Sequence, residues 1–171
     1  MQDMSKYIIV VADAHRARMF TLKESLTPET ESSPHLVEQE CLVNPKKKKN
    51  GAQSRGIGIS GRSRTASGAS YAFDDHHSKR EQDELRKFTS TIVKESLKQI
   101  KKADAHWLVL VAEGKTLGLL RDTLAGIKTK GLTIHECDRE LTSETPAKIQ
   151  DLLAKRKLVP SMKKPEKRVR K

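Results

Sequence analysis

Two short apolar runs limit the architecture that this sequence can adopt. Tyr7–Ala12 reads YIIVVA, and His106–Ala112 reads HWLVLVA. Unbroken apolar segments of this length, rich in β-branched residues, are typical of central strands that are buried on both faces. A sheet with such strands needs helices packed against it, so the two runs predict an α/β domain.

The other strands can be placed around these two runs. Asp13–Arg16 has turn chemistry, and Ala17–Leu22 is expected to return as the second strand of a hairpin. His35–Val43 has the composition of a partly exposed third strand, and Leu132–Asp138 is expected to be the fifth. We therefore predict a mixed five-stranded sheet, in which a three-strand antiparallel meander is followed by two βα units.

Three segments have the features of helices. Ser78 and Glu81 fit the S-x-x-E capping box, and apolar residues at helical spacing continue from there to about Lys102. The segment KTLGLLRDTLA is expected to form a second helix that stops at Gly126. The pair Thr145–Pro146 supplies an N-cap and a first helical position, so a last helix is expected to begin there.

The positive charge is concentrated outside these elements. The 171 residues carry a formal net charge of +12. The Gly/Ser-rich segment 44–73 holds +7 and the segment 155–171 holds +8, and subtracting both from +12 leaves −3 for the rest of the chain. At about 30 residues, segment 44–73 is also much longer than an ordinary connection in a compact domain. The presumed folded body is therefore slightly acidic and carries two basic segments.

Runs of a single charge sign in Gly- or Pro-punctuated segments favour a polyanionic partner, here a ribosome or structured RNA. The alternative is that they only keep the protein soluble. Neither run has apolar residues at helical spacing, so we expect no membrane insertion. The candidate phosphate-binding residues are Lys46, Lys47, Lys48, Lys49, Arg55, Arg62, Arg64, Lys163, Lys164, Lys167, Arg168, Arg170 and Lys171.

The chain is expected to consist of one domain, 1–154, that includes the basic loop 44–73, followed by a basic tail, 155–171. Hydrophobic residues make up 35% of the sequence, a low share, so part of the chain is expected to lie outside any core. We expect the segment beyond Leu158 to be unstructured without a partner. Cys41 and Cys137 lie in expected strands, where buried free thiols are the default. No apolar run resembles a signal peptide or a membrane span, so a cytoplasmic location is expected.

Several segments together resemble the bacterial host-attachment family, the proteins required for attachment to host cells. The opening YIIVVADAHRARMF is followed in order by a Gly/Arg/Ser-rich insert, YAFDDHHSKREQDELRKFTSTIVKESL and HWLVLVAEGKTLGLLRDTL. The last landmark, HECDRELTSETPAKIQDLL, contains an acid-x-x-Leu-Thr stretch before the final helix. The resemblance covers about residues 6–154. That family in turn resembles the middle domain of archaeal and eukaryotic class I peptide-release factors, which implies an RNase H-like sheet.

In release factors the loop after the third strand is basic and carries Gly-Gly-Gln, which acts at the ester of peptidyl-tRNA. In this chain the same place reads Lys46–Lys49 and then NGAQS, so Gln53 matches the glutamine while Ala52 replaces the second glycine. Alanine disfavours the positive φ that glycine permits. The preferred function is therefore a non-catalytic RNA- or ribosome-binding factor. The alternatives are attachment through a protein partner and, third, ester hydrolysis through Gln53.

Three other patterns are candidates for chemical sites. GIGISG, residues 56–61, fits G-x-G-x-x-G but lacks the flanking strand and helix that a dinucleotide site requires. Asp74–His77 reads DDHH just before the expected long helix and is a poor metal cage at this spacing. Asp13 and Glu113 follow two central strands, but two carboxylates are too few for a two-metal nuclease, and Asp13 is equally explained as a turn residue. We expect no cofactor and no metal ion.

Overall fold

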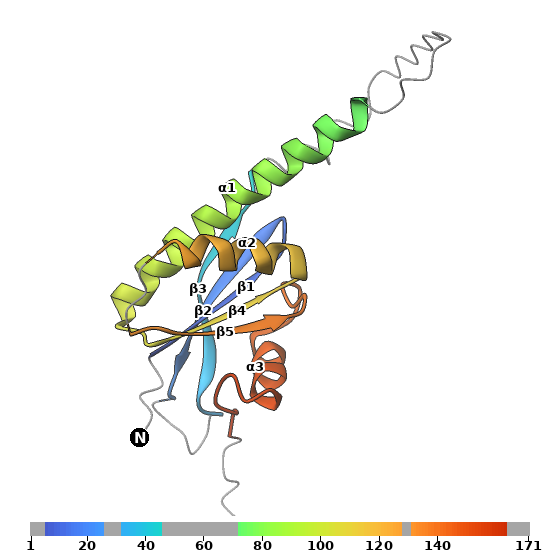
Figure 1. Cartoon of the computed structure of the whole chain (residues 1–171). Helices are drawn as coiled ribbons and strands as arrows, with labels where there is room; N and C mark the ends of the chain where they lie inside the picture. The colour runs from blue at the N-terminus through green and yellow to red at the C-terminus, as the bar shows by residue number, and fades with distance from the viewer. Residues whose placement is uncertain (1–5, 26–31, 46–71, 128–130, 164–171) are drawn as a thin grey trace, which may run out of the picture.

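The computed structural model describes residues 6–25, 32–45, 72–127 and 131–163. Figure 1 shows a sheet with helices on both sides and one long helix that extends well beyond it. The elements in chain order are β1 (Tyr7–Ala12), β2 (Arg16–Lys23), β3 (His35–Val43), α1 (Ala72–Ala103), β4 (Trp107–Ala112), α2 (Gly114–Ala125), β5 (Thr133–Asp138) and α3 (Pro146–Lys155).

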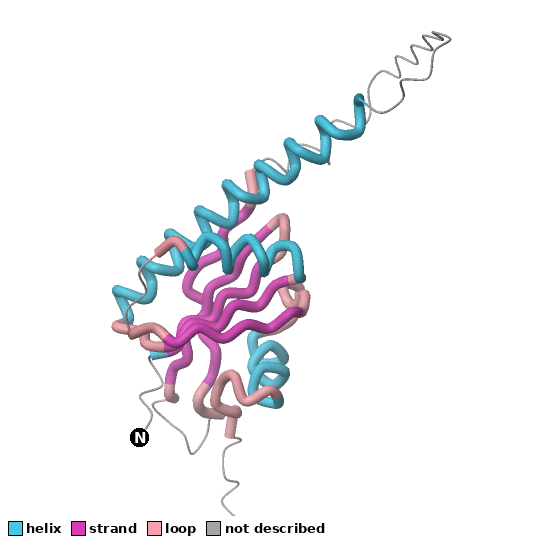
Figure 2. Tube along the Cα trace, viewed as in Figure 1, coloured by secondary structure: helices cyan, strands magenta, loops and turns pink. Residues whose placement is uncertain are grey.

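The strands form one five-stranded sheet in the order β3-β2-β1-β4-β5. β1 pairs antiparallel with β2, and β2 pairs antiparallel with β3, which confirms the predicted meander. β1 and β4 run parallel, with Tyr7 opposite Trp107 and Ala12 opposite Ala112, and β4 is parallel to β5. The first strand of the chain therefore lies at the centre of the sheet (Figure 2). The expected mixed α/β sheet is confirmed, while its RNase H-like character stays a prediction.

Side chains of the central strands alternate between two cores, one on each face of the sheet. Ile8 and Val10 face α1 and α2, where they pack with Phe88 and other apolar residues. Ile9 and Val11 face the opposite core, which α3 covers. Both faces of β1 are buried, as its unbroken apolar sequence predicts.

The long helix α1 begins earlier than the capping box predicts. It starts at Ala72, so Ser78 and Glu81 lie within the helix, and the prediction of an N-cap at Ser78 is wrong. The sequence Asp74–His77 also lies in the helix and not before it. The expected N-terminus of α3 is confirmed, because Thr145 Oγ1 accepts a hydrogen bond from Lys148 N at 3.4 Å.

The fold continues past α3 into the segment that was expected to be unstructured. Val159 is 6% exposed and belongs to the core under α3. The backbone of Lys163 exchanges two hydrogen bonds with Ser33, of 3.0 and 3.1 Å. Gln150 is fully buried and donates to the carbonyls of Pro34 and Pro160. The expectation is therefore wrong for residues 159–163, which pack onto the sheet domain.

The two cysteines differ from each other. Cys137 is buried, as expected, but Cys41 is exposed, because β3 is an edge strand and this side chain does not reach either core. Within the described ranges, no helix is both long enough and apolar enough to cross a membrane.

Candidate functional site

The carboxyl ends of the parallel strands meet along one edge of the sheet, which we call the carboxyl edge. Ala12, Ala112 and Asp138 lie in register there, at the ends of β1, β4 and β5. The chain leaves β1 toward β2 and leaves β4 toward α2, so adjacent strands diverge. Divergence of this kind is where open α/β sheets usually place their ligand sites.

The basic loop is attached to this edge. β3 ends beside the β1–β2 turn, where Asn44 N donates to the carbonyl of His15 at 2.7 Å. The Asn44 side chain also donates to the carbonyl of Ala14 at 3.1 Å and is almost fully buried. Asn44 therefore fixes the point at which the chain leaves the sheet for residues 46–71.

Asp13 organises the turn between β1 and β2. Its Oδ1 accepts hydrogen bonds from the backbone N–H groups of His15 and Arg16, as expected of an aspartate in a turn. Its Oδ2 accepts from the Thr142 hydroxyl at 2.6 Å, a residue 129 positions later in the chain. Burial alone raises the pKa of Asp13, but these hydrogen bonds outweigh it and hold the pKa below its ordinary value.

Arg18 ties the same two parts of the chain together. Its guanidinium forms a bidentate pair with Glu38 at 2.7 and 2.9 Å, and this pairing lowers the pKa of that carboxyl. It also donates to the carbonyls of Thr142 and Glu144, at 3.0 and 2.7 Å. The guanidinium carbon lies 4.9 Å from the centre of the Phe20 ring. The Arg18 guanidinium is thus held by one carboxylate and two backbone carbonyls.

These contacts form what we call the carboxyl-edge cluster: Asp13, Arg16, Arg18, Glu38, Thr142 and Ser143. Every charged group in it already has partners, so the cluster stabilises the loop before α3 and does not offer a free acid or base. Among the described residues, no group of three His, Cys, Asp or Glu side chains could hold a metal ion. Asp13 is therefore explained by the turn and by Thr142.

The sequence-predicted binding residues are placed only in part. Gln53, Lys46–Lys49, Arg55, Arg62 and Arg64 lie outside the described residues, and their roles stay predictions. The same holds for Lys164, Lys167, Arg168, Arg170 and Lys171. Lys163 is described: it is exposed, and its backbone pairs with Ser33, near the start of β3. Lys163 therefore lies near the start of β3, whereas the basic loop follows the opposite end of the same strand.

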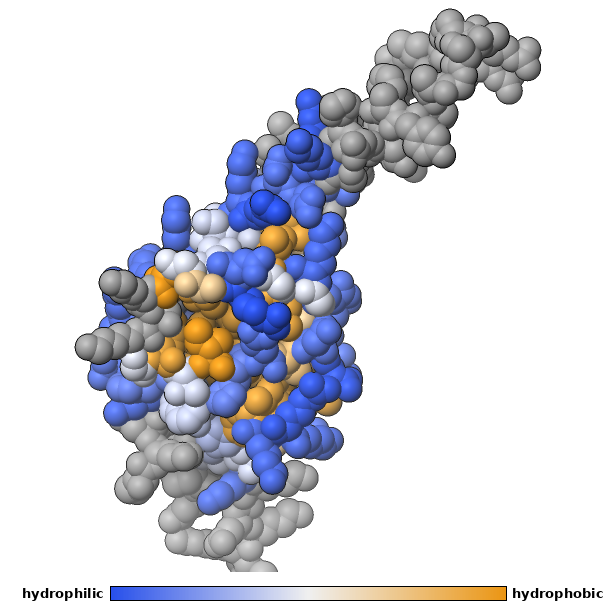
Figure 3. Space-filling view, viewed as in Figure 1, coloured by the Kyte–Doolittle hydropathy of each residue, from blue (hydrophilic) through white to orange (hydrophobic). Residues whose placement is uncertain are grey.

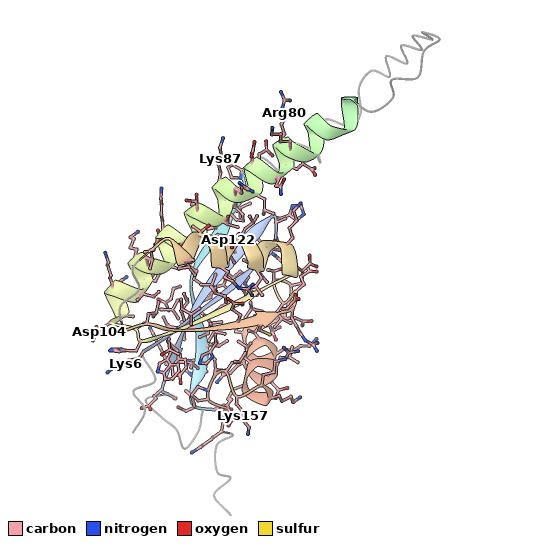
Figure 4. The ribbon with its side chains drawn as sticks, viewed as in Figure 1. Lys6, Arg80, Lys87, Asp104, Asp122 and Lys157 are labelled. Carbon is pink, nitrogen blue, oxygen red and sulfur yellow. The ribbon has the colours of Figure 1, made fainter. Side chains whose placement is uncertain are left out.

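The outer face of α1 carries cations that the sequence analysis overlooked. Between residues 87 and 102 the exposed positions of α1 hold five lysines and one threonine, and no acid. We call the five the α1 lysine row. They are Lys87, Lys94, Lys98, Lys101 and Lys102. Figure 4 shows Lys87, and Arg80 one heptad before it, pointing away from the sheet. The signal was present in the spacing of seven between Arg80, Lys87, Lys94 and Lys101, which keeps side chains on one side of a helix.

A hollow of about 500 Å³ lies between α2 and the edge strand β5. Leu124, Ile127 and Ile134 contribute to its lining, and Figure 3 shows apolar residues gathered on this face. Arg121 pairs with Glu136 beside it, which raises the pKa of the arginine and lowers that of the glutamate. In the described part of the hollow, the charged groups are therefore neutralised by each other.

A family model described as "Protein required for attachment to host cells" matches residues 8–153. The matched span runs from β1 to the last turn of α3 and includes every residue of the carboxyl-edge cluster. No curated protein matches the chain.

Proposed function

We propose that this chain, which belongs to the family of proteins required for attachment to host cells, serves as a non-catalytic RNA- or ribosome-binding factor. The observation that carries the proposal is the distribution of charge. Segments 44–73 and 155–171 hold +7 and +8, while the remainder holds −3. Proteins that bind nucleic acid backbones carry such localised positive charge. The proposal places the protein in the cytoplasm.

The geometry at the ends of the basic loop supports this proposal. The loop runs from Asn44, which is fixed to the β1–β2 turn, to Ala72, where α1 begins. Figure 1 shows the first half of α1 extending beyond the sheet, and residues 79–83 are exposed. A large partner can therefore approach this part of α1 without obstruction from the folded body.

The expected mode of binding is contact with phosphates. The candidate loop residues are lysines and arginines, and the 4% aromatic content of the chain leaves few rings for base stacking. Binding through phosphates releases counterions, so the affinity falls steeply as the salt concentration rises. Binding through phosphates also distinguishes little between RNA sequences.

The family description favours a second candidate, an attachment-related role through a protein partner. This candidate differs in its salt dependence, since a protein interface with an apolar centre need not weaken steeply with salt. The two candidates are therefore separated by one measurement.

The test is sedimentation with ribosomes at low and high salt. The wild type is compared with a variant in which Lys46–Lys49 are changed to Ala. A control changes four exposed cations outside both basic segments, Lys23, Lys115, Arg139 and Lys148, also to Ala. We expect the wild type and the control to pellet at low salt and the loop variant to remain in solution. If the wild type stays in solution, or if the loop variant pellets like the control, the proposed function is wrong.

A further inference from the structure

We infer that the α1 lysine row is a second phosphate-binding surface, which binds the backbone of structured RNA alongside the basic loop. The inference rests on the proposed function for the identity of the polyanion. It adds a surface on the described body, in an element that the charge count had assigned to the slightly acidic remainder.

The row is available for binding because its charges are not neutralised by the protein. Within the described ranges, the one ion pair of the row joins Lys98 to Glu95, at 3.2 Å, and the Lys98 side chain is still 72% exposed. Lys87, Lys94 and Lys101 are exposed without such a pair there. By contrast, the body pairs Lys148 with Glu144 and Lys155 with Asp151, both at 2.8 Å.

The spacing of the row suits an extended polyanion. Lys87, Lys94 and Lys101 follow at intervals of seven residues, which places them about 10 Å apart along one side of the helix. The helix that carries them is held rigidly, because Phe88, Ile92 and Val93 on its other side are buried against the sheet. A fixed line of ammonium groups matches a phosphate backbone without reading its bases.

An anionic membrane is a poorer partner for this surface. Helices that bind at a membrane interface bury an apolar face among the lipids. The apolar face of α1 is already occupied by the sheet, as Phe88 is 5% and Ile92 0% exposed. Only the charged side remains, so the row favours a partner that is itself a line of charges.

The test measures binding of a fluorescently labelled RNA hairpin over a range of salt concentrations. The row variant carries Lys87→Gln, Lys94→Gln and Lys101→Gln. A matched control carries Lys23→Gln, Lys115→Gln and Arg139→Gln, which remove the same charge from exposed sites outside α1 and outside both basic segments.

We expect the row variant to lose about tenfold or more in affinity at low salt. The slope of log K against log salt should fall by about 2, since each lost phosphate contact removes 0.7 to 0.9. The control should change both quantities much less. Asp83 is an exposed acid at the projecting end of the same face, so Asp83→Asn should tighten binding. Equal losses in the row variant and the control overturn the inference.

The variant with Lys46–Lys49 changed to Ala, assayed in parallel, separates this inference from the proposed function. If that variant loses binding while the row variant matches the control, the inference is wrong and the proposed function stands. If only the row variant loses binding, the inference stands and the role given to the loop is wrong. If the wild type captures phosphatidylserine-containing vesicles but no RNA, both are wrong.

Discussion

The carboxyl-edge cluster and the α1 lysine row use positive charge in opposite ways. Arg18 is 14% exposed and meets a carboxylate, two carbonyls and an aromatic ring. The lysines of the row are exposed, and within the described residues only Lys98 forms an ion pair. A cation with several partners holds the fold together, while a cation without them remains free to bind another molecule. Mutations in the two regions should therefore separate stability from binding.

The largest effect on stability is expected at Arg18. Arg18→Ala leaves Glu38 and the carbonyls of Thr142 and Glu144 without their donor, which should cost roughly 2–3 kcal/mol in the free energy of unfolding. Urea denaturation measures this loss. Arg18→Lys keeps the charge but not the bidentate geometry, so its free energy of unfolding should lie between those of the wild type and Arg18→Ala. A loss no larger than that of Arg121→Ala would show that the partners of Arg18 do not stabilise the fold.

A smaller effect is expected at Asp13. Asp13→Asn replaces a charged acceptor by a neutral one, so the hydrogen bonds from Thr142 and from the turn should weaken at a cost of about 1 kcal/mol. Urea denaturation at neutral pH measures the cost. Thr142→Val removes the other partner and should give a similar loss, and the double variant should lose less than the sum of the two. Simple additivity would show that Asp13 and Thr142 do not act as a unit.

The same residue predicts a pH dependence. Because the pKa of Asp13 is lower in the folded state than its ordinary value of 3.8, its carboxylate stabilises the fold above that pH. The contribution is lost as the pH falls through 3.8 toward the lower folded pKa. The stability difference between the wild type and Asp13→Asn should therefore be constant near neutral pH and shrink below 3.8. A difference that grows on acidification contradicts this assignment.

Arg121 provides the exposed counterpart of Arg18. Its pair with Glu136 is also bidentate, but the arginine side chain is 59% exposed. Exposed pairs gain little over hydration by water and are screened by salt. Arg121→Ala should therefore leave the urea midpoint almost unchanged. A large loss would mean that exposure does not distinguish the two arginines.

The smallest effect on stability is expected in the row itself. Lys87→Gln, Lys94→Gln and Lys101→Gln together remove three like charges from a protein of net charge +12. Reduced self-repulsion should leave the unfolding midpoint equal to that of the wild type or slightly higher. Measurable destabilisation would indicate that these lysines have structural partners, and would weaken their assignment as a binding surface.

The strands were predictable because their signal is local. Tyr7–Ala12 and His35–Val43 have the predicted bounds, since apolar and β-branched runs depend only on neighbouring residues. The start of α1 was not predictable in this way. A capping box at Ser78 competes with the helical continuation toward Ala72, and the sequence pattern does not decide between them.

The carboxyl-edge cluster and the α1 lysine row also differ in how well local sequence patterns predict them. The cluster at the carboxyl edge joins Asp13 to Thr142 across 129 positions, and no spacing rule gives such a pair. The α1 lysine row, however, was readable from its heptad spacing. It was missed because a net charge of −3 for the whole body averages the acidic loops with the basic face of one helix.

The order of the strands also affects how the chain folds during its synthesis. β1 is synthesised first but lies at the centre of the sheet, and its parallel partner β4 follows 100 positions later, as Tyr7 pairs with Trp107. At translation rates of about 5–20 residues per second, β1 waits on the order of 5–20 s for that partner. The β1–β2–β3 meander forms from nearby residues and shields one edge of β1 in the meantime, but the other edge stays open until β4 emerges. The nascent chain therefore passes through a period in which its most apolar strand is the one least protected against aggregation.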